Sequence, residues 1–204
     1  GIVLVLFSSQ TNKQKIDSFI EQNMFTYDLL EEKNVGMFET LYVYCVKSEG
    51  IREALQSRSV KNISYLTKGQ RGLVFKAQWD KNAFEKKYLA SEELVDVAIK
   101  IRSKESKAVN RIENEIYWLR KVNKESIGPQ LYFFGKEYFV MEFIKGKDLP
   151  KFIEQQGKSS EKVLKELLRQ CFVLDKLKVS KEEFGRPLKN VVVLKDLSVV
   201  LLDF

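Results

Sequence analysis

The apolar positions of the first sixty residues predict a small α+β unit. Residues 1–9 (GIVLVLFSS) are interpreted as a buried strand, and residues 10–25 place apolar side chains at helical spacing after an N-cap at Thr11 or Asn12. Two further strands and a short helix are predicted over residues 26–32, 37–48 and 49–59. The order strand, helix, strand, strand, helix is typical of a small α+β domain, and it contains no pattern that indicates catalytic chemistry.

From about Ile63 the pattern changes and predicts a five-stranded sheet interrupted by one long helix. The strands carry alternating apolar side chains, whereas the helix repeats them every three or four positions. The first hairpin, the third strand, the helix and the last two strands are predicted over residues 63–79, 95–103, 106–123, 129–135 and 137–144. This change of pattern places a domain boundary at residue 62, between an accessory domain and a second domain over residues 63–204.

Two helices and a final hairpin are predicted after the sheet. The helices cover residues 147–156 and 159–179, and the hairpin joins two apolar runs between residues 190 and 204. The longer helix has a candidate N-cap at Ser159 or Ser160. Its predicted buried stripe comprises Val163, Leu164, Leu167, Leu168, Cys171 and Leu174.

The composition is that of a globular protein and excludes several classes of site. The chain has 204 residues, of which 44% are apolar, enough for a sizeable core. The apolar run from Ile2 to Phe7 is too short to cross a bilayer and has no basic flank of a signal peptide, so we expect a cytoplasmic protein without a membrane partner. Cys45 and Cys171 lie far apart in apolar surroundings, which favours small buried thiols over a disulfide. Because the sequence has no His, a Ser-His-Asp triad, a Cys-His dyad and a His-type zinc site are excluded.

Positive charge is concentrated in the second part of the chain. Residues 1–62 carry 7 Lys or Arg against 8 Asp or Glu, whereas residues 63–204 carry 28 against 20. The resulting excess of 28 − 20 = +8 attracts polyanions. Nucleotide phosphates, RNA and acidic protein surfaces all fit this charge equally well.

A glycine-containing turn is the first candidate for chemistry. Gly69, Gly72 and Val74 have the spacing G-x-x-G-x-V between two predicted strands. Glycines allow backbone amides to approach phosphate oxygens closely. A plain hairpin turn fits the same residues, so both interpretations stay open at this point.

A lysine within an apolar strand is the second candidate. In VAIK, residues 97–100, Lys100 stands among apolar residues, and a buried lysine needs an ionised partner. The partner is predicted on the following helix, at Glu115 or, as the alternative, at Glu113. A surface lysine with a buried stem is the other interpretation of Lys100.

Taken in order, these motifs resemble the protein-kinase signature. The glycine turn, VAIK, the helix glutamate, FVMEFIKGKDL (residues 139–149), a polar loop and a terminal Leu-Asp-Phe follow one another over residues 63–204. The sequence is similar to compact archaeal kinases related to the RIO and KEOPS-complex kinases, in which a Glu-x-x-Arg-Pro-x-Lys run replaces His-Arg-Asp; EFGRPLK, residues 183–189, fits that run. The resemblance implies a bilobal α+β kinase-like fold after the small accessory domain. Its five-stranded N-lobe would span about residues 63–145 and its reduced helical C-lobe about residues 146–204.

The resemblance also implies cofactors, ATP and Mg²⁺, and a role for each matching residue. Lys100 would contact the α- and β-phosphates and be held by Glu115, Glu183 would orient the substrate hydroxyl, and Lys189 would neutralise charge on the transferred phosphoryl group. The hinge that meets the adenine would span residues 142–144, with Met141 beside it. The implied nucleotide site comprises Gly69, Gly72, Val74, Ala98, Lys100, Glu115, Met141, Glu142 and Ile144, and the implied Mg²⁺ ligands are Asp203 and Asn190.

The loop around Glu183 departs from the family pattern. It lacks the His, Glu182 is a rival for the catalytic position, and Asn190 lies seven residues after Glu183, where kinases have five residues from Asp to Asn. Thr67 stands where the first glycine of the usual loop would be. We therefore predict an atypical serine/threonine protein kinase whose acceptors include its own chain. The alternatives are a pseudokinase or ATPase acting as a nucleotide-binding partner module, a small-molecule kinase, and an RNA- or ribosome-associated factor.

Overall fold

A computed structural model of the chain describes residues 1–69, 72–84, 93–102, 111–156, 160–179 and 190–202. The chain divides into two compact units. The first consists of Gly1–Gly69 with Leu73–Val95, and the second consists of Gln70–Gly72 with Asp96–Phe204. The predicted accessory domain, residues 1–62, lies wholly within the first unit.

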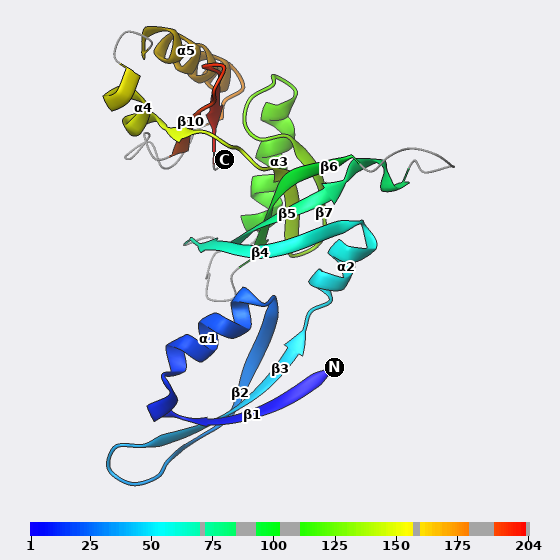
Figure 1. Cartoon of the computed structure of the whole chain (residues 1–204), viewed down its shortest axis with the longest axis vertical. Coiled ribbons are helices and arrows are strands. Elements are labelled where there is room, and N and C mark those ends of the chain that lie inside the picture. The colour runs from blue at the N-terminus through cyan, green and yellow to red at the C-terminus, as the bar shows by residue number, and fades with distance from the viewer. Residues whose placement is uncertain (70–71, 85–92, 103–110, 157–159, 180–189, 203–204) are drawn as a thin grey trace. The chain divides into compact units, whose positions relative to one another are not determined.

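The first unit begins with a three-stranded antiparallel sheet in the order β1-β3-β2 (Figure 1). Its elements follow the predicted order: β1 (Ile2–Ser8), the 3-10 turn η1 (Ser9–Thr11), α1 (Lys13–Gln22), β2 (Phe25–Asn34), β3 (Thr40–Ser48) and α2 (Ile51–Ser57). Helix α1 begins where the Asn12 side chain accepts a hydrogen bond from the Lys15 amide, which is one of the two predicted caps.

Helix α1 packs on one face of this sheet through an aromatic cluster. Phe7, Ile20 and Tyr44 are buried there, and the ring of Tyr44 stacks on that of Tyr27 with 4.1 Å between centroids. The Tyr44 hydroxyl donates a hydrogen bond of 2.8 Å to Asp17 on α1. The cluster therefore holds α1 against the sheet, and Tyr44 binds the Asp17 carboxylate of that helix.

Strand β1 is not the buried strand that its apolar sequence predicts. Ile2, Leu4 and Leu6 are 65–70% exposed, and only Phe7 is buried. Alternate side chains of a strand point to opposite faces, and α1 packs on the face that carries Phe7. The uncovered face explains these three exposed side chains. Val3 shares the face of Phe7 and is still 60% exposed, so α1 covers only part of that face.

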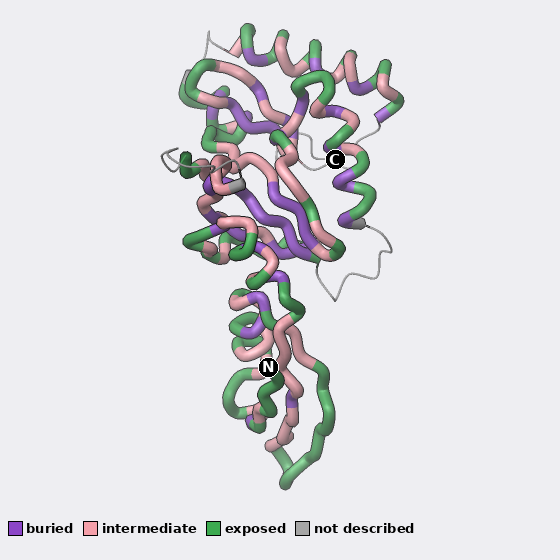
Figure 2. The backbone as a smooth tube through the Cα atoms, turned by 90° about the vertical axis from the view of Figure 1, so that its right-hand side faces the viewer, coloured by how far each residue is buried: buried purple, intermediate pink, exposed green. Residues whose placement is uncertain are grey.

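Five strands form a second sheet in the order β4-β5-β6-β8-β7, as predicted in number. They are β4 (Val60–Lys68), β5 (Gly72–Asp80), β6 (Leu94–Arg102), β7 (Leu131–Phe134) and β8 (Tyr138–Glu142), with a short 3-10 helix, η2 (Lys81–Phe84), after β5. The pairs β4–β5, β6–β8 and β7–β8 are antiparallel. Figure 2 shows buried residues, in purple, along the strands of this sheet. Strand β6 is buried on both faces from Val97 to Ile101.

In the second unit, helix α3 (Arg111–Asn123) buries Ile112, Ile116, Leu119 and Val122. The further elements are β9 (Lys147–Asp148), α4 (Leu149–Gln156), α5 (Ser160–Lys176), β10 (Val191–Val193) and β11 (Val199–Leu201). Strands β10 and β11 form the predicted hairpin, and β9 adds an antiparallel strand that the sequence pattern did not predict. All these elements except β9 contribute to one apolar core.

The buried face of α5 differs from the predicted stripe. Val163, Gln170 and Leu174 are buried, whereas Leu164 is 41% and Leu168 is 69% exposed. The apolar stripe is wider than the surface that α4 and β11 cover, so one side of it faces outward. Helical periodicity identifies the stripe but not which side of it meets the core.

The prediction for the two cysteines also has a structural outcome. Cys45 and Cys171 remain thiols, as predicted, although both are half-buried rather than fully buried. No helix in the described part of the chain is long and apolar enough to cross a bilayer.

Candidate functional site

The side chains of Lys100 and Glu115 form a buried ion pair. Lys100 lies on β6 and Glu115 on α3, with 2.6 Å between Nζ and Oε2 and only 7% and 8% of their side chains exposed. The pairing predicted from the sequence is therefore present. Glu113, the alternative partner, lies on the exposed side of α3.

Stability alone does not explain this buried pair. Removing each ion from water costs several kcal/mol, and the attraction between the two does little more than offset that loss. Well-packed apolar side chains of the same size would stabilise the protein at least as well. Buried charges in such arrangements are more frequent at functional sites than elsewhere.

Gly72 has a packing reason to be glycine. A Cβ atom at this position would fall on the carbonyl oxygen of Ile101, closer than real contacts allow. The backbone of β5 can therefore begin at this point only without a side chain. Gly69 follows β4, Val74 pairs with Thr67 across the β4–β5 hairpin, and residues 70–71 of the turn lie outside the described residues.

The predicted adenine-contacting residues lie on two neighbouring strands. In the β6–β8 register Ala98 stands opposite Met141 and Val97 opposite Glu142. The Glu142 amide donates a hydrogen bond of 2.8 Å to the carbonyl of Gln130. The N–H of Ile144, by contrast, makes no hydrogen bond within the described part of the chain, which leaves a backbone donor for a planar polar ligand.

Of the residues predicted to act in phosphoryl transfer and Mg²⁺ binding, only some fall within the described part of the chain. The Asn190 carbonyl accepts a hydrogen bond of 2.8 Å from the amide of Leu202, which continues the β10–β11 ladder. Asn190 is thus paired with the residue that precedes Asp203 in the sequence. Asp203, Glu183 and Lys189 lie outside the described residues. Among the residues that are described, no group of three or more Cys, Asp or Glu gathers in a way that could hold a metal ion.

Gln170 is a buried polar residue that the sequence prediction missed. Its side-chain amide is buried within α5 and donates hydrogen bonds of 2.8 Å to the Val199 carbonyl and 2.9 Å to Glu166. The contact ties β11, the strand that leads towards Asp203, to α5. Its spacing with Val163 and Leu174 could have revealed it, because a polar residue interrupts an otherwise apolar repeat at that point.

A lysine on a sheet strand that is ion-paired to a helix glutamate is a feature of protein kinases. Comparison with known families agrees with this class: the model described as protein tyrosine and serine/threonine kinase matches residues 60–184. The match covers more than half of the 204 residues. The chain therefore belongs to the protein tyrosine and serine/threonine kinase family. No curated protein matches the chain.

Proposed function

We propose that the chain is an ATP- and Mg²⁺-dependent kinase that transfers a phosphoryl group to serine or threonine hydroxyls of proteins, its own chain included. We place it among the compact kinases related to the RIO and KEOPS-complex kinases, because EFGRPLK replaces the usual His-Arg-Asp run. The observation that carries the proposal is the buried Lys100–Glu115 pair within the region that matches the kinase family.

The described residues fit a nucleotide in two respects. The Lys100 ammonium, held by Glu115, is a cation suited to the α- and β-phosphates. The N–H of Ile144 is a donor for the adenine edge at the end of β8. Gly69, Gly72 and Val74 would cover the phosphates from the β4–β5 hairpin.

The proposed roles in phosphoryl transfer and Mg²⁺ binding rest on the sequence and on the β10–β11 hairpin. Asp203 and Asn190 would hold Mg²⁺, which neutralises phosphate charge when it is bound. Glu183 would accept the hydrogen bond of the acceptor hydroxyl and orient it. Lys189 would stabilise charge on the transferred group. Because phosphoryl transfer depends mainly on positioning and charge, a glutamate can replace aspartate if its loop is shaped around the longer side chain.

The test measures phosphoryl transfer from labelled ATP with Mg²⁺ to a generic protein acceptor and to the chain itself. The wild type is compared with Lys100→Ala and Asp203→Ala. Lys162→Ala, an exposed lysine of α5, serves as the matched control. We expect transfer by the wild type and the control, and a loss of about 10²-fold or more in both site variants.

The possible results separate the candidate functions. Equal phosphoryl transfer by all four proteins would show that neither Lys100 nor Asp203 is needed for the transfer, and it would refute the kinase proposal. ATP binding without transfer would support a pseudokinase. Binding of RNA in place of ATP, weakened steeply by salt, would support the RNA-associated alternative. Formation of phosphoserine or phosphothreonine rather than phosphotyrosine on the acceptor would identify the hydroxyl class.

A further inference from the structure

Strand β1 forms an open edge of the three-stranded sheet β1-β3-β2. It pairs with β3 in an unbroken antiparallel register from Ile2 to Ser8. On its other side, the backbone amides and carbonyls of β1 meet no further strand among the described residues. An exposed row of such groups is a template on which another strand can pair.

The two edges of this sheet differ in how they are protected. The β2 edge carries Asp28, Glu31, Glu32 and Lys33, and its pairing with β3 shifts register between Leu29 and Glu31. Charged side chains and such irregularities are the usual means by which an edge strand avoids pairing. Strand β1, with the sequence IVLVLFS, has no charge, no proline and no shift in register. The contrast indicates that the β1 edge takes a partner and the β2 edge does not.

The side chains of β1 are exposed on both of its faces. Ile2, Leu4 and Leu6 are 65–70% exposed on the face away from α1, and Val3 is 60% exposed on the other face. A layer packed on the outer face of the sheet would leave Val3 uncovered, and it would also meet the charged Lys47 opposite Ile2. A strand added at the edge contacts side chains on both faces at once. The exposure pattern therefore favours pairing along the edge of β1 over packing on the face of the sheet.

The net charge of the accessory domain suits a second copy of the same chain. Residues 1–62 carry 7 Lys or Arg against 8 Asp or Glu, which gives a net charge of 7 − 8 = −1. A unit so close to neutral favours association between like copies. A second β1 also brings no charge of its own to the contact.

Strand β1 is complementary to itself. In an antiparallel pair centred on Leu4, Ile2 stands opposite Leu6 of the second copy, and Val3 stands opposite Val5 of the second copy. Each apolar side chain thus meets another apolar side chain, on both faces of the joined sheet. Such cross-strand pairs are the units that stabilise antiparallel sheets.

We propose that β1 pairs with β1 of a second copy of this chain about a two-fold axis at Leu4, so that two three-stranded sheets join into one sheet of six strands. Both free edges of the joined sheet are then β2, whose charges end the assembly at two chains. One strand from each copy makes a contact smaller than a standard interface, which buries about 800 Å² per partner. We therefore expect a weak dimer with a dissociation constant on the order of 100 µM.

The test follows the mass of the full chain by analytical ultracentrifugation between about 5 and 500 µM, a range that brackets this dissociation constant. The wild type should change from monomer to dimer across the range. Leu4→Lys and Leu4→Glu each place like charges opposite one another at the two-fold axis, so each should weaken the dimer by at least about tenfold. An equal mixture of the two variants places Lys opposite Glu and should restore dimers to near the wild-type level.

A matched control separates this contact from a general effect of charge. Met37, in the turn between β2 and β3, is a 90% exposed apolar side chain outside β1. Met37→Lys and Met37→Glu make the same changes in net charge and should alter the dissociation constant by less than about twofold, because exposed charges beyond a Debye length are screened. Leu4 is itself exposed, so its variants should fold, which circular dichroism checks.

Five results would overturn the proposal. The first three are a monomer at every concentration, equal weakening by the Leu4 and Met37 variants, and no recovery in the mixture. The fourth, growth beyond a dimer, would show that another edge or face associates instead. The fifth, protection of the β1 edge amides from hydrogen exchange in the dilute monomer, would show that another segment of the same chain covers this edge. None of these measurements requires ATP, so the dimer proposal and the kinase proposal can fail separately.

Discussion

Replacement of the Lys100–Glu115 pair should separate the stability of the chain from its phosphoryl transfer. At the observed separation of 2.6 Å, the attraction is about 6 kcal/mol at an effective dielectric constant of about 20. Removal of the two ions from water costs several kcal/mol each, so the intact pair contributes little net stability. Loss of one partner leaves the other as a buried, uncompensated charge.

We therefore expect opposite results from single and double replacement. Glu115→Leu and Lys100→Met alone should each lower the free energy of unfolding by about 3–5 kcal/mol. The double variant Lys100→Met/Glu115→Leu should lie within about 1 kcal/mol of the wild type or be more stable. All three variants should lose phosphoryl transfer, because none retains a positioned cation for the phosphates.

Urea unfolding measures the stability of this part of the chain. In a Trp79→Phe background, Trp118 on α3 is the only tryptophan that remains, so its fluorescence follows the second unit. The midpoint and slope together give the free energy of unfolding. The exposed pair Glu161–Lys165, with about three quarters of each side chain accessible, is the control cycle and should show a coupling below about 0.5 kcal/mol.

The reasoning about this pair can fail in two distinct ways. If the effects of Glu115→Leu and Lys100→Met simply add in the double variant, the two charges are not coupled and the structural interpretation is wrong. If the double variant folds and still transfers phosphate at the wild-type rate, the pair is structural and its assignment to the nucleotide is wrong.

Three further predictions follow from local geometry. Burial and the neighbouring Asp17 raise the pKa of Tyr44, so the contribution of Tyr44 to stability is fully present below the pKa of an unfolded tyrosine, about 10. This contribution is lost as pH rises through the pKa of Tyr44 in the folded protein. Tyrosinate absorbance should show one late-titrating group fewer in Tyr44→Phe, and Asp17→Asn should lower the pKa of Tyr44. The hydrogen bonds from Arg169 lower the pKa of Glu166, so the contribution of Glu166 to stability is present above the pKa of an unfolded glutamate, about 4.3, and is lost as pH falls through its pKa in the folded protein. Arg169→Met should make the free energy of unfolding depend less on pH in acid. An unchanged pH dependence would contradict the effect of Arg169 on Glu166. Gly72→Ala should lower the free energy of unfolding by about 1–3 kcal/mol, because the new Cβ meets a backbone carbonyl of β6. A change below about 0.5 kcal/mol in urea unfolding would show that the backbone of β5 moves to make room for the methyl group.

Much of the order of elements is predictable from the sequence because period and turn residues are local signals. The first sixty residues and the β10–β11 hairpin follow the predicted order. Exposure is less predictable, because it depends on which neighbours arrive. Leu168 and Leu174 belong to the same predicted apolar stripe of α5, yet Leu168 is exposed and Leu174 is buried. Strand β9 is only two residues long, Lys147 and Asp148, and exists because β10 supplies its hydrogen bonds, so no pattern of its own could predict it.

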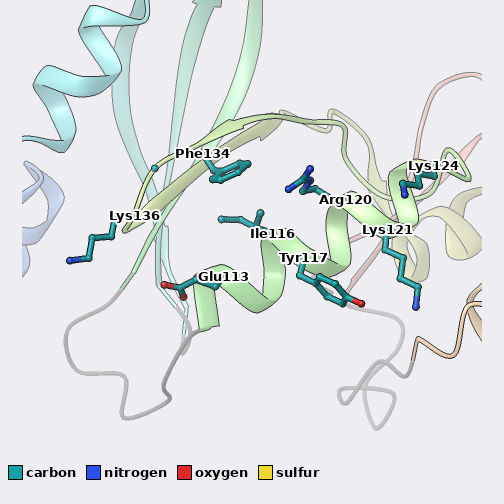
Figure 3. A pocket seen from close by; sticks show the side chains of 9 residues that line it. Glu113, Ile116, Tyr117, Arg120, Lys121, Lys124, Phe134 and Lys136 are labelled. Carbon is teal, nitrogen blue, oxygen red and sulfur yellow. The ribbon is translucent and has the colours of Figure 1, made fainter.

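Buried charges and ordinary surface residues differ in the same respect. Lys100 is conspicuous in the sequence because it places a charge inside an apolar strand, and a violation of a local rule needs an explanation even before the fold is known. Arg120 and Lys124 violate nothing, since cations four residues apart on a helix are ordinary surface residues. They come to line one pocket with Phe134 only because the β7–β8 hairpin lies against the same side of α3 (Figure 3). Sites that depend on a locally unfavourable residue can therefore be predicted from one sequence, whereas sites assembled from ordinary residues become visible only when distant segments are placed together.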